Sequence, residues 1–236
     1  MRGLNAAEYI PGMLHSAFVD QEDALRNRYS LEVMGEIIEV DSPLAGVHQQ
    51  RNIAVAIAAA VELRNSHGFK ITPAHIAEGI RQTRWPGRLE RIHVPGKTDV
   101  LMDVAHNPAG AWALRAALSS LEDASLRNSA TSGGKRVLVF GCMKDKAYEE
   151  MAQILFPLFD LVVATPVESP RSATAEDLLQ AAAKTGVPAT AARDGHEALE
   201  TAWAQASPDG SVVVAGSVYL VGEVRPLLER AAGRPR

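Results

Sequence analysis

Apolar, strand-like segments alternate with helix-like segments along the chain from Arg91 to its end. This alternation predicts an α/β fold: a Rossmann-like domain with a mostly parallel sheet flanked by helices on both faces. The predicted strands are Arg91–Val94, Val100–Asp103, Arg136–Phe140, Leu161–Ala164, Ala189–Ala191 and Ser211–Ala215. The predicted helices are Pro108–Leu121, Ala147–Phe156, Ala175–Lys184, Gly195–Ala206 and Tyr219–Ala232. The polar stretch Glu122–Lys135 is predicted to be a flexible loop.

The chain before Arg91 follows a different pattern and predicts a separate unit. Leu31–Val40 has the pattern of a strand near a sheet edge, and His48–Leu63 and Pro73–Gln82 have those of helices. The first of these helices is apolar on nearly all of its faces, which predicts that it is buried. We place the domain boundary in the turn that follows the second helix, so that the expected domains are residues 1–85 and 86–236.

Composition and charge exclude several classes of function. The 236 residues are 47% hydrophobic and 22% charged, which is typical of a soluble globular protein. The formal net charge of −4, with scattered basic residues, gives no attraction to nucleic acid. No stretch has the pattern of a signal peptide or a membrane span. Cys142 is the single cysteine and has no partner for an internal disulfide, so a cytoplasmic location is expected.

Polar side chains gather where the predicted strand Val100–Asp103 meets the next helix. Asn107 is expected to cap that helix, with Pro108 at its first position. A helix N-terminus suits a carboxylate or phosphate, and ligands of open α/β sheets bind outside the carboxyl ends of strands. Asp103 and His106 are therefore candidate site residues. The alternative is an ordinary strand-to-helix turn in which Asp103 is a capping carboxylate.

Two residues before this joint are also candidates for binding a nucleotide. Asn52 lies on the apolar helix, where its amide can pair with a purine edge, or with a neighbouring backbone or side-chain group. Arg88 lies in a proline-glycine turn, where its guanidinium can bind a phosphate. The alternative for Arg88 is a solvated side chain or an ion pair with Glu90. Asp103 can accept hydrogen bonds from ribose hydroxyls.

Five motifs resemble the folylpolyglutamate synthase/dihydrofolate synthase family of the Mur ligase superfamily. They are His48-Gln49-Gln50-Arg51-Asn52, Trp85-Pro86-Gly87-Arg88-Leu89-Glu90, Asp103-Val104-Ala105-His106-Asn107-Pro108, the run Val137–Lys146, and Gly216-Ser217-Val218-Tyr219-Leu220-Val221-Gly222-Glu223. Enzymes of this family use MgATP to phosphorylate a pteroate or γ-glutamyl carboxylate, and the amine of L-glutamate then attacks the acyl phosphate. The resemblance implies an ATP-dependent ligase of folate biosynthesis that acts on dihydropteroate or folate polyglutamates.

The resemblance also implies roles for individual residues. It places Asn52 on the adenine of ATP, places Arg88 and Asp103 on ATP, and places His106 beside the reacting phosphate or the incoming amino acid as the catalytic residue. Ser217 either caps the last helix or touches substrate. Relatives are commonly monomers, so a monomer is expected.

One departure from the family is large. The chain has no Gly-x-x-x-x-Gly-Lys-Ser/Thr phosphate loop. In the family this loop, the magnesium ligands and the pterin site precede the helix that holds Asn52. The first domain is therefore expected to be the C-terminal part of a truncated ATP-binding domain, with the Mg²⁺ ligands upstream and no stand-alone ATP turnover. Alternatives are a non-catalytic nucleotide- or metabolite-binding remnant and a peptidoglycan-type Mur ligase domain, although Ala105–Pro108 and Tyr219–Glu223 argue against the latter.

Overall fold

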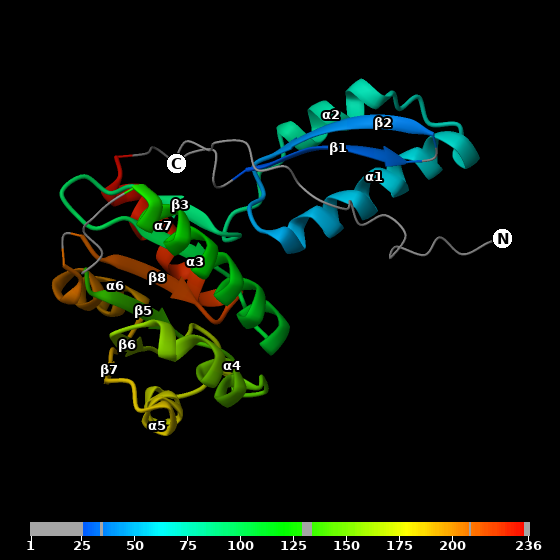
Figure 1. The fold of residues 1–236 in the computed structure, drawn as a ribbon. Helices are drawn as coiled ribbons and strands as arrows, with labels where there is room; N and C mark the ends of the chain where they lie inside the picture. The colour runs from blue at the N-terminus through cyan, green and yellow to red at the C-terminus, as the bar shows by residue number, and fades with distance from the viewer. Residues whose placement is uncertain (1–25, 34, 129–133, 208, 234–236) are drawn as a thin grey trace. The chain divides into compact units, whose positions relative to one another are not determined.

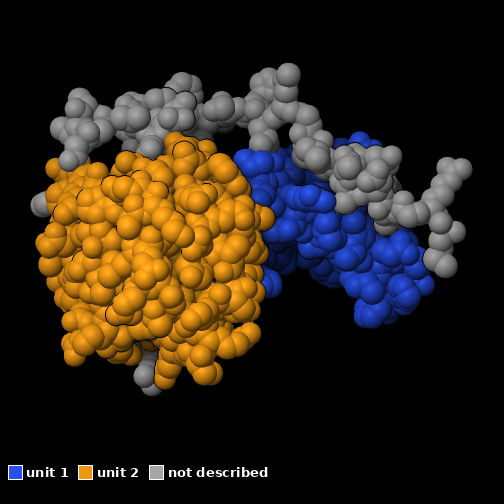
Figure 2. Space-filling view, turned by 90° about the horizontal axis from the view of Figure 1, so that it is seen from below, with its two compact units in different colours: residues 1–85 blue, residues 86–236 orange. Residues whose placement is uncertain are grey.

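The computed structural model describes residues 26–33, 35–128, 134–207 and 209–233 (Figure 1). The chain divides into two compact units, residues 1–85 and residues 86–236, which Figure 2 distinguishes by colour. Each unit has its own sheet and is described by itself. In the described part of the chain, no helix is both long enough and apolar enough to cross a membrane.

The first unit contains a β-hairpin where a single strand is predicted. Strands β1 (Asn27–Val33) and β2 (Glu36–Ser42) pair in antiparallel register, with Leu31 opposite Ile38. The prediction of one strand over Leu31–Val40 is wrong because the chain reverses between Val33 and Glu36. Gly35, with φ of 81°, takes the left-handed conformation that such a turn requires.

Two helices pack on this hairpin. Helix α1 (Val47–His67) packs on β1, and α2 (Pro73–Arg81) packs on β2. The second helix begins as predicted, with the Thr72 side chain accepting a hydrogen bond from the His75 N–H and Pro73 at the first position. The core consists of apolar side chains from both strands and both helices: Leu31, Val33, Ile38, Val40, Ile53, Ile57, Val61, Ile76 and Ile80. Packing against helices supplies the stability that an isolated two-stranded sheet lacks.

Helix α1 buries one stripe of residues rather than nearly all of its faces. The buried positions follow a four-residue spacing, Gln49, Ile53, Ile57 and Val61. Val55 and Leu63 lie outside this stripe and are 53% and 40% exposed. The prediction that the whole helix is buried is therefore wrong within the described part of the chain.

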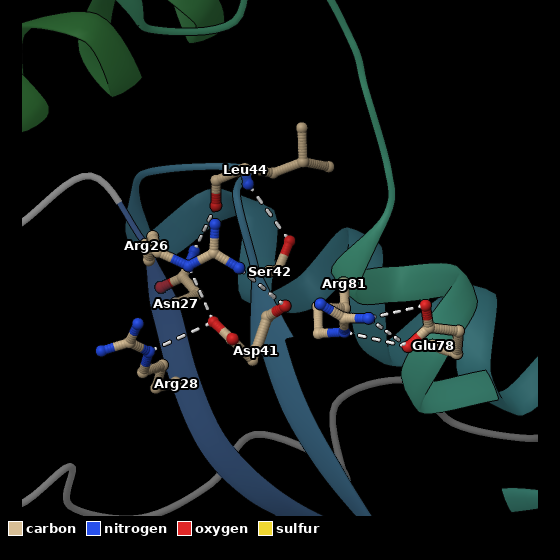
Figure 3. Close-up of polar contacts among 8 residues, drawn as sticks. All are labelled: Arg26, Asn27, Arg28, Asp41, Ser42, Leu44, Glu78 and Arg81. Carbon is tan, nitrogen blue, oxygen red and sulfur yellow. Dashed lines mark hydrogen bonds and ion pairs between the residues drawn. The ribbon is translucent and has the colours of Figure 1, made fainter. Parts of the chain in front are cut away.

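A group of charged side chains lies on the outer face of the hairpin and on the neighbouring helix (Figure 3). Asp41 accepts hydrogen bonds from the Nε atoms of Arg26, at 2.8 Å, and Arg28, at 3.2 Å. The hydrogen bond from Arg26, joined by that from Arg28, lowers the pKa of Asp41. Glu78 and Arg81 form a second pair on α2, at 2.7 Å. These pairs are partly exposed, so each contributes little to stability.

The second unit is an α/β domain with a six-stranded sheet, which confirms the predicted fold class. The strand order is β3-β4-β8-β5-β6-β7, and every neighbouring pair is parallel except β3 with β4. The bounds are β3 Glu90–Ile92, β4 Val100–Asp103, β5 Arg136–Phe140, β6 Leu161–Ala164, β7 Ala189–Ala191 and β8 Ser211–Ala215. Five of the six strands match their predicted bounds. β3 begins one residue early and ends two residues early.

Helices cover both faces of this sheet (Figure 1). α6 (Gly195–Gln205) and α7 (Val218–Ala231) pack together over one face. α3 (Pro108–Asn128), α4 (Tyr148–Leu155) and α5 (Ala175–Thr185) pack in sequence along the other, and a short 3₁₀ turn, Phe156–Leu158, follows α4. The prediction of a loop from Glu122 is wrong as far as Asn128, because α3 continues to that residue. Residues 129–133 of that predicted loop lie outside the described residues.

Candidate functional site

The connections of the sheet place the candidate site at the carboxyl ends of β4, β8 and β5. β8 lies between β4 and β5, and Asp103 at the end of β4 pairs in register with Ala215 at the end of β8. The chain leaves β4 toward α3 on one face of the sheet and leaves β8 toward α7 on the other. Neighbouring strands that diverge in this way open the crevice where ligands of α/β proteins bind. Asp103 and His106 lie on this edge, as predicted.

Gly216 allows the ends of β8 and β5 to approach closely. Gly216 follows β8 with φ of 112°, and a Cβ atom there would lie 2.6 Å from the carbonyl oxygen of Gly141 and 2.8 Å from the Phe140 ring. Only glycine fits this position without moving the backbone. The glycine of the C-terminal motif therefore sets the spacing of the edge.

Asp103 is buried and acts as a clamp on two pieces of backbone. It is 5% exposed, and its Oδ1 atom accepts a hydrogen bond of 2.9 Å from the Ala105 N–H. Its Oδ2 atom accepts one of 3.0 Å from the N–H of Leu89, fourteen residues earlier in the chain. The carboxylate therefore joins the end of β4 to the turn that precedes β3. In the capping alternative, the Asp103 carboxylate accepts hydrogen bonds from the backbone at the start of helix α3. Asp103 instead binds the Ala105 N–H before that helix and the Leu89 N–H in the turn.

The turn that contains Arg88 is built by backbone contacts with its surroundings. Val104 N–H donates a hydrogen bond of 2.9 Å to the carbonyl oxygen of Gly87. Gly87 has φ of 70°, and a Cβ atom there would lie 2.8 Å from the Val221 side chain. Leu89 has φ of 49°, the one positive value among the described non-glycine residues. Positive φ at a leucine is uncommon and persists only where the surroundings hold it.

Glu90 pairs with Arg225 on α7 instead of with Arg88. The guanidinium of Arg225 lies 3.1 Å from the carboxylate of Glu90, and the same carboxylate accepts a hydrogen bond of 2.8 Å from the Gly87 N–H. The alternative in which Glu90 takes Arg88 as its ion-pair partner is therefore wrong. Sequence reasoning missed Arg225, because its only signal is a charged residue within the apolar pattern of the last helix.

Arg88 itself is half-buried and makes no hydrogen bond or ion pair with any other described residue. Its neighbours Gly87 and Leu89 are both buried. An arginine in a hydrogen-bonded turn, with no partner for its five N–H donors among the described residues, is suited to bind a carboxylate or a phosphate. The structure thus brings Asp103, at the end of β4, against the turn that carries Arg88.

His106 lies at the start of α3, beside the helix cap. The Asn107 side chain accepts a hydrogen bond of 2.8 Å from the Gly110 N–H, which confirms the predicted cap. His106 is exposed, and its Nε2 atom lies 3.4 Å from the Asn107 side-chain nitrogen. Its imidazole is therefore available to a ligand at the edge of the sheet.

Other motif residues take structural positions. Ser217 is 2% exposed and caps α7 by accepting a hydrogen bond of 3.1 Å from the Tyr219 N–H. Cys142 is buried, and burial raises the pKa of its thiol to about 12, so it is not a nucleophile near neutral pH. Lys144 lies on the surface, 4.0 Å from Asp177.

Asn52 belongs to the first unit and lies on the exposed side of α1. Its side-chain nitrogen donates a hydrogen bond of 2.9 Å to Gln49 Oε1, so the amide has a neighbouring partner. Gln49 is buried and in turn contacts the His48 ring at 3.1 Å. The helix begins at Val47 after Gly46, and no side chain caps it.

A cavity in the described part of the second unit lies apart from the predicted site residues. A cavity of about 500 Å³ lies beyond the ends of β6 and β7, lined by Pro166, Thr174, Ala192, Arg193 and Glu197 among others. None of the four predicted site residues lines it. The described residues include no group of three or more His, Cys, Asp or Glu side chains able to hold a metal ion.

Comparison with known proteins gives one family and several relatives. Residues 87–218 match the family described as Mur ligase, glutamate ligase domain. The chain is 30% identical over 206 residues to the folylpolyglutamate synthase of Lacticaseibacillus casei, covering 82% of this chain and 41% of that protein. It is 32% identical over 212 residues to the UDP-N-acetylmuramoyl-L-alanyl-D-glutamate–2,6-diaminopimelate ligase of Alkalilimnicola ehrlichii, covering 87% of this chain and 39% of that protein.

A solved structure extends this similarity to the fold. The structure of Mycobacterium tuberculosis folylpolyglutamate synthase complexed with ADP matches with a TM-score of 0.70 at 27% identity. The match covers 86% of this chain and 46% of that one. The chain therefore spans less than half the length of the proteins that it resembles.

Proposed function

Because the chain belongs to the folylpolyglutamate synthase/dihydrofolate synthase family of the Mur ligase superfamily, we propose that it is part of an ATP-dependent acid–amino-acid ligase. The reaction adds L-glutamate to dihydropteroate or to folate polyglutamates. Residues 86–236 would serve as the glutamate ligase domain, and residues 1–85 as the C-terminal part of the ATP-binding domain. The observation that best supports this proposal is the hydrogen-bonded turn that presents Arg88 without a partner among the described residues, beside Asp103.

The proposed site assigns a separate task to each candidate. Arg88 binds phosphate oxygens of ATP through its guanidinium. Asp103 anchors the turn of Arg88 and meets the ribose at its small exposed edge. His106, exposed beside the N-terminus of α3, lies next to the reacting phosphate or the incoming glutamate. Asn52 contributes an amide to the adenine, and Gln49 already orients that amide.

The described residues offer a partner for ATP but no cluster of ligands for Mg²⁺. ATP supplies the phosphoryl group that activates a carboxylate, and the half-buried Arg88 offers an anion partner for it. Mg²⁺ finds no ligand cluster among the described residues, and the sequence has no phosphate loop. We therefore propose that the Mg²⁺ ligands and the phosphate loop come from another part of the ligase, and that this polypeptide alone does not turn over ATP.

The turn that carries Arg88 and the lack of a phosphate loop in the sequence also favour a second candidate function. A chain with an anion-binding turn but no phosphate loop can act as a non-catalytic module that binds a nucleotide or an anionic metabolite. The similarity to a diaminopimelate ligase is attributed to superfamily kinship, since Ala105–Pro108 and Tyr219–Glu223 follow the folate-type pattern. We still expect the protein to be located in the cytoplasm and to be a monomer.

A chimera separates the two candidates. This chain replaces the matching portion of the Lacticaseibacillus casei synthase, and amide formation is measured with dihydropteroate or a folate, glutamate and MgATP. We expect product from the chimera and none from the chain alone. A folded chimera that binds ATP but forms no amide favours the non-catalytic module, and product from the chain alone contradicts the need for another part.

Arginine variants of the same chimera test the site. Arg88→Ala is expected to weaken ATP binding by about 10- to 100-fold, the loss typical of hydrogen bonds to a charged group. Arg91→Ala is the matched control, because Arg91 is an exposed arginine three residues away. Equal ATP affinities for the two variants would contradict the role of Arg88.

A further inference from the structure

The backbone on both sides of Arg88 is fixed by hydrogen bonds. The carbonyl oxygen of Gly87 accepts from the Val104 N–H at 2.9 Å. The Leu89 N–H donates to Asp103 at 3.0 Å, and the Gly87 N–H donates to Glu90 at 2.8 Å. These three bonds leave Arg88 between two anchored residues. They also support Leu89 in a left-handed conformation that a leucine rarely adopts.

The anchor at Gly87 depends on a second side chain, from the last helix. Arg225 Nε lies 3.1 Å from both carboxylate oxygens of Glu90, and its Nη2 atom lies 3.1 Å from one of them. The side chain of Glu90 is 21% exposed and that of Arg225 is 28% exposed, so water screens the ion pair weakly. Arg225 also contacts Glu229 at 2.9 Å on the same helix. Glu90 therefore has its charge balanced and its orientation set while it holds the turn.

We infer that Glu90 and Arg225 are positioning residues that hold the turn in the conformation in which Arg88 meets an anionic ligand. The inference rests on the proposed function, which assigns the phosphates of ATP to Arg88. A preset turn spares the ligand the cost of ordering a loop, so binding keeps more of the interaction with Arg88. Removing the pair loosens the turn and weakens binding only through Arg88.

A double-mutant cycle on the full chain tests this coupling, with ATP titrated by calorimetry. Glu90→Gln is expected to weaken ATP affinity about tenfold, within the range for residues of one hydrogen-bond network. The same substitution in an Arg88→Ala background is expected to cause no further loss. Glu229→Gln is the matched control, because it removes the other partner of Arg225 without touching the turn. Equal losses in both backgrounds, or no loss from Glu90→Gln, overturn the inference.

An exchange of the two charges separates stability from positioning. The double variant Glu90→Arg with Arg225→Glu restores an ion pair but leaves the Gly87 N–H without a carboxylate acceptor. We expect the melting temperature to recover toward that of the parent while ATP affinity stays low. Recovery of both quantities would show that the pair acts only through stability, and would overturn the positioning role.

A measurement without nucleotide distinguishes failure of the inference from failure of the proposed function. NMR order parameters of the Arg88 backbone amide are expected near the rigid value of about 0.85 in the parent and lower in Glu90→Gln. A mobile Arg88 in the parent, or no change in the variant, overturns the positioning role whatever binds. A rigid turn together with unchanged affinity in Arg88→Ala instead refutes the proposed phosphate contact.

Discussion

Replacing Gly216 by alanine tests whether the ends of β8 and β5 are set by close backbone approach. A methyl group there would lie 2.6 Å from the Gly141 carbonyl oxygen and 2.8 Å from the Phe140 ring. Gly96 is the matched control, since its φ of 73° is also positive but a methyl group on it would have no neighbour within 4 Å. Positive φ costs an alanine about 1–2 kcal/mol at Gly96 and at least as much at Gly216, whose φ of 112° lies outside the left-handed α region. Overpacking adds about 1–3 kcal/mol at Gly216 alone.

We therefore expect Gly216→Ala to lose about 2–5 kcal/mol of unfolding free energy and Gly96→Ala about 1–2 kcal/mol. Urea unfolding followed by circular dichroism measures both losses, and equal m-values would show that the denatured states are comparable. Both glycines belong to the second unit, so the comparison concerns the same folded domain. Equal losses would refute the claim that backbone contact makes glycine necessary after β8.

Burial leads to three further predictions. The Cys142 thiol, with its pKa raised to about 12, is expected to react with a disulfide reagent at least about 100-fold more slowly in the native chain than in urea; equal rates would contradict this. Burial raises the pKa of Glu223 in the folded protein. The stability that protonated Glu223 contributes to the fold is therefore present at low pH and is lost as pH rises through the folded-state pKa. Glu223→Gln is therefore expected to melt higher than the parent at pH 7.5, with the gap closing toward pH 4.5, and a constant gap argues against this. Ile57→Ala, at a fully buried site, is expected to cost about 2–5 kcal/mol in urea unfolding, while Val55→Ala stays within about 0.5 kcal/mol; similar losses would mean that both faces of α1 are covered.

The second unit was predictable because its four central strands, β4, β8, β5 and β6, are short apolar runs buried on both faces. Such runs carry the same signal wherever they lie in a parallel sheet, and helix patterns separate them clearly. The hairpin of the first unit was missed for a physical reason. Leu31 and Val33 face the core at odd positions, whereas Ile38 and Val40 face it at even positions. A single strand cannot change parity, so this change, with Gly35 between, was the available signal.

The polar contacts of the candidate site residues were less predictable than the positions of these residues in the fold. The location of Asp103 and His106 follows from the strand-to-helix joint, and the Asn107 cap follows from the Asn-Pro pair. The hydrogen-bond partners of Asp103 do not follow from the sequence, because the Leu89 N–H is a backbone group that only folding brings near Asp103. Arg225 lies 135 residues from Glu90, and no local pattern connects them.

The contacts of Asp103 indicate that Asp103 and Arg88 have different roles in the proposed site. Both carboxylate oxygens already accept a backbone N–H, and the residue is 5% exposed. A ribose hydroxyl can reach this carboxylate only at its small exposed edge. Arg88 instead offers a guanidinium with no partner among the described residues. Affinity for an anionic ligand is therefore expected to depend directly on Arg88, while Asp103 acts mainly through the shape of the turn that carries it.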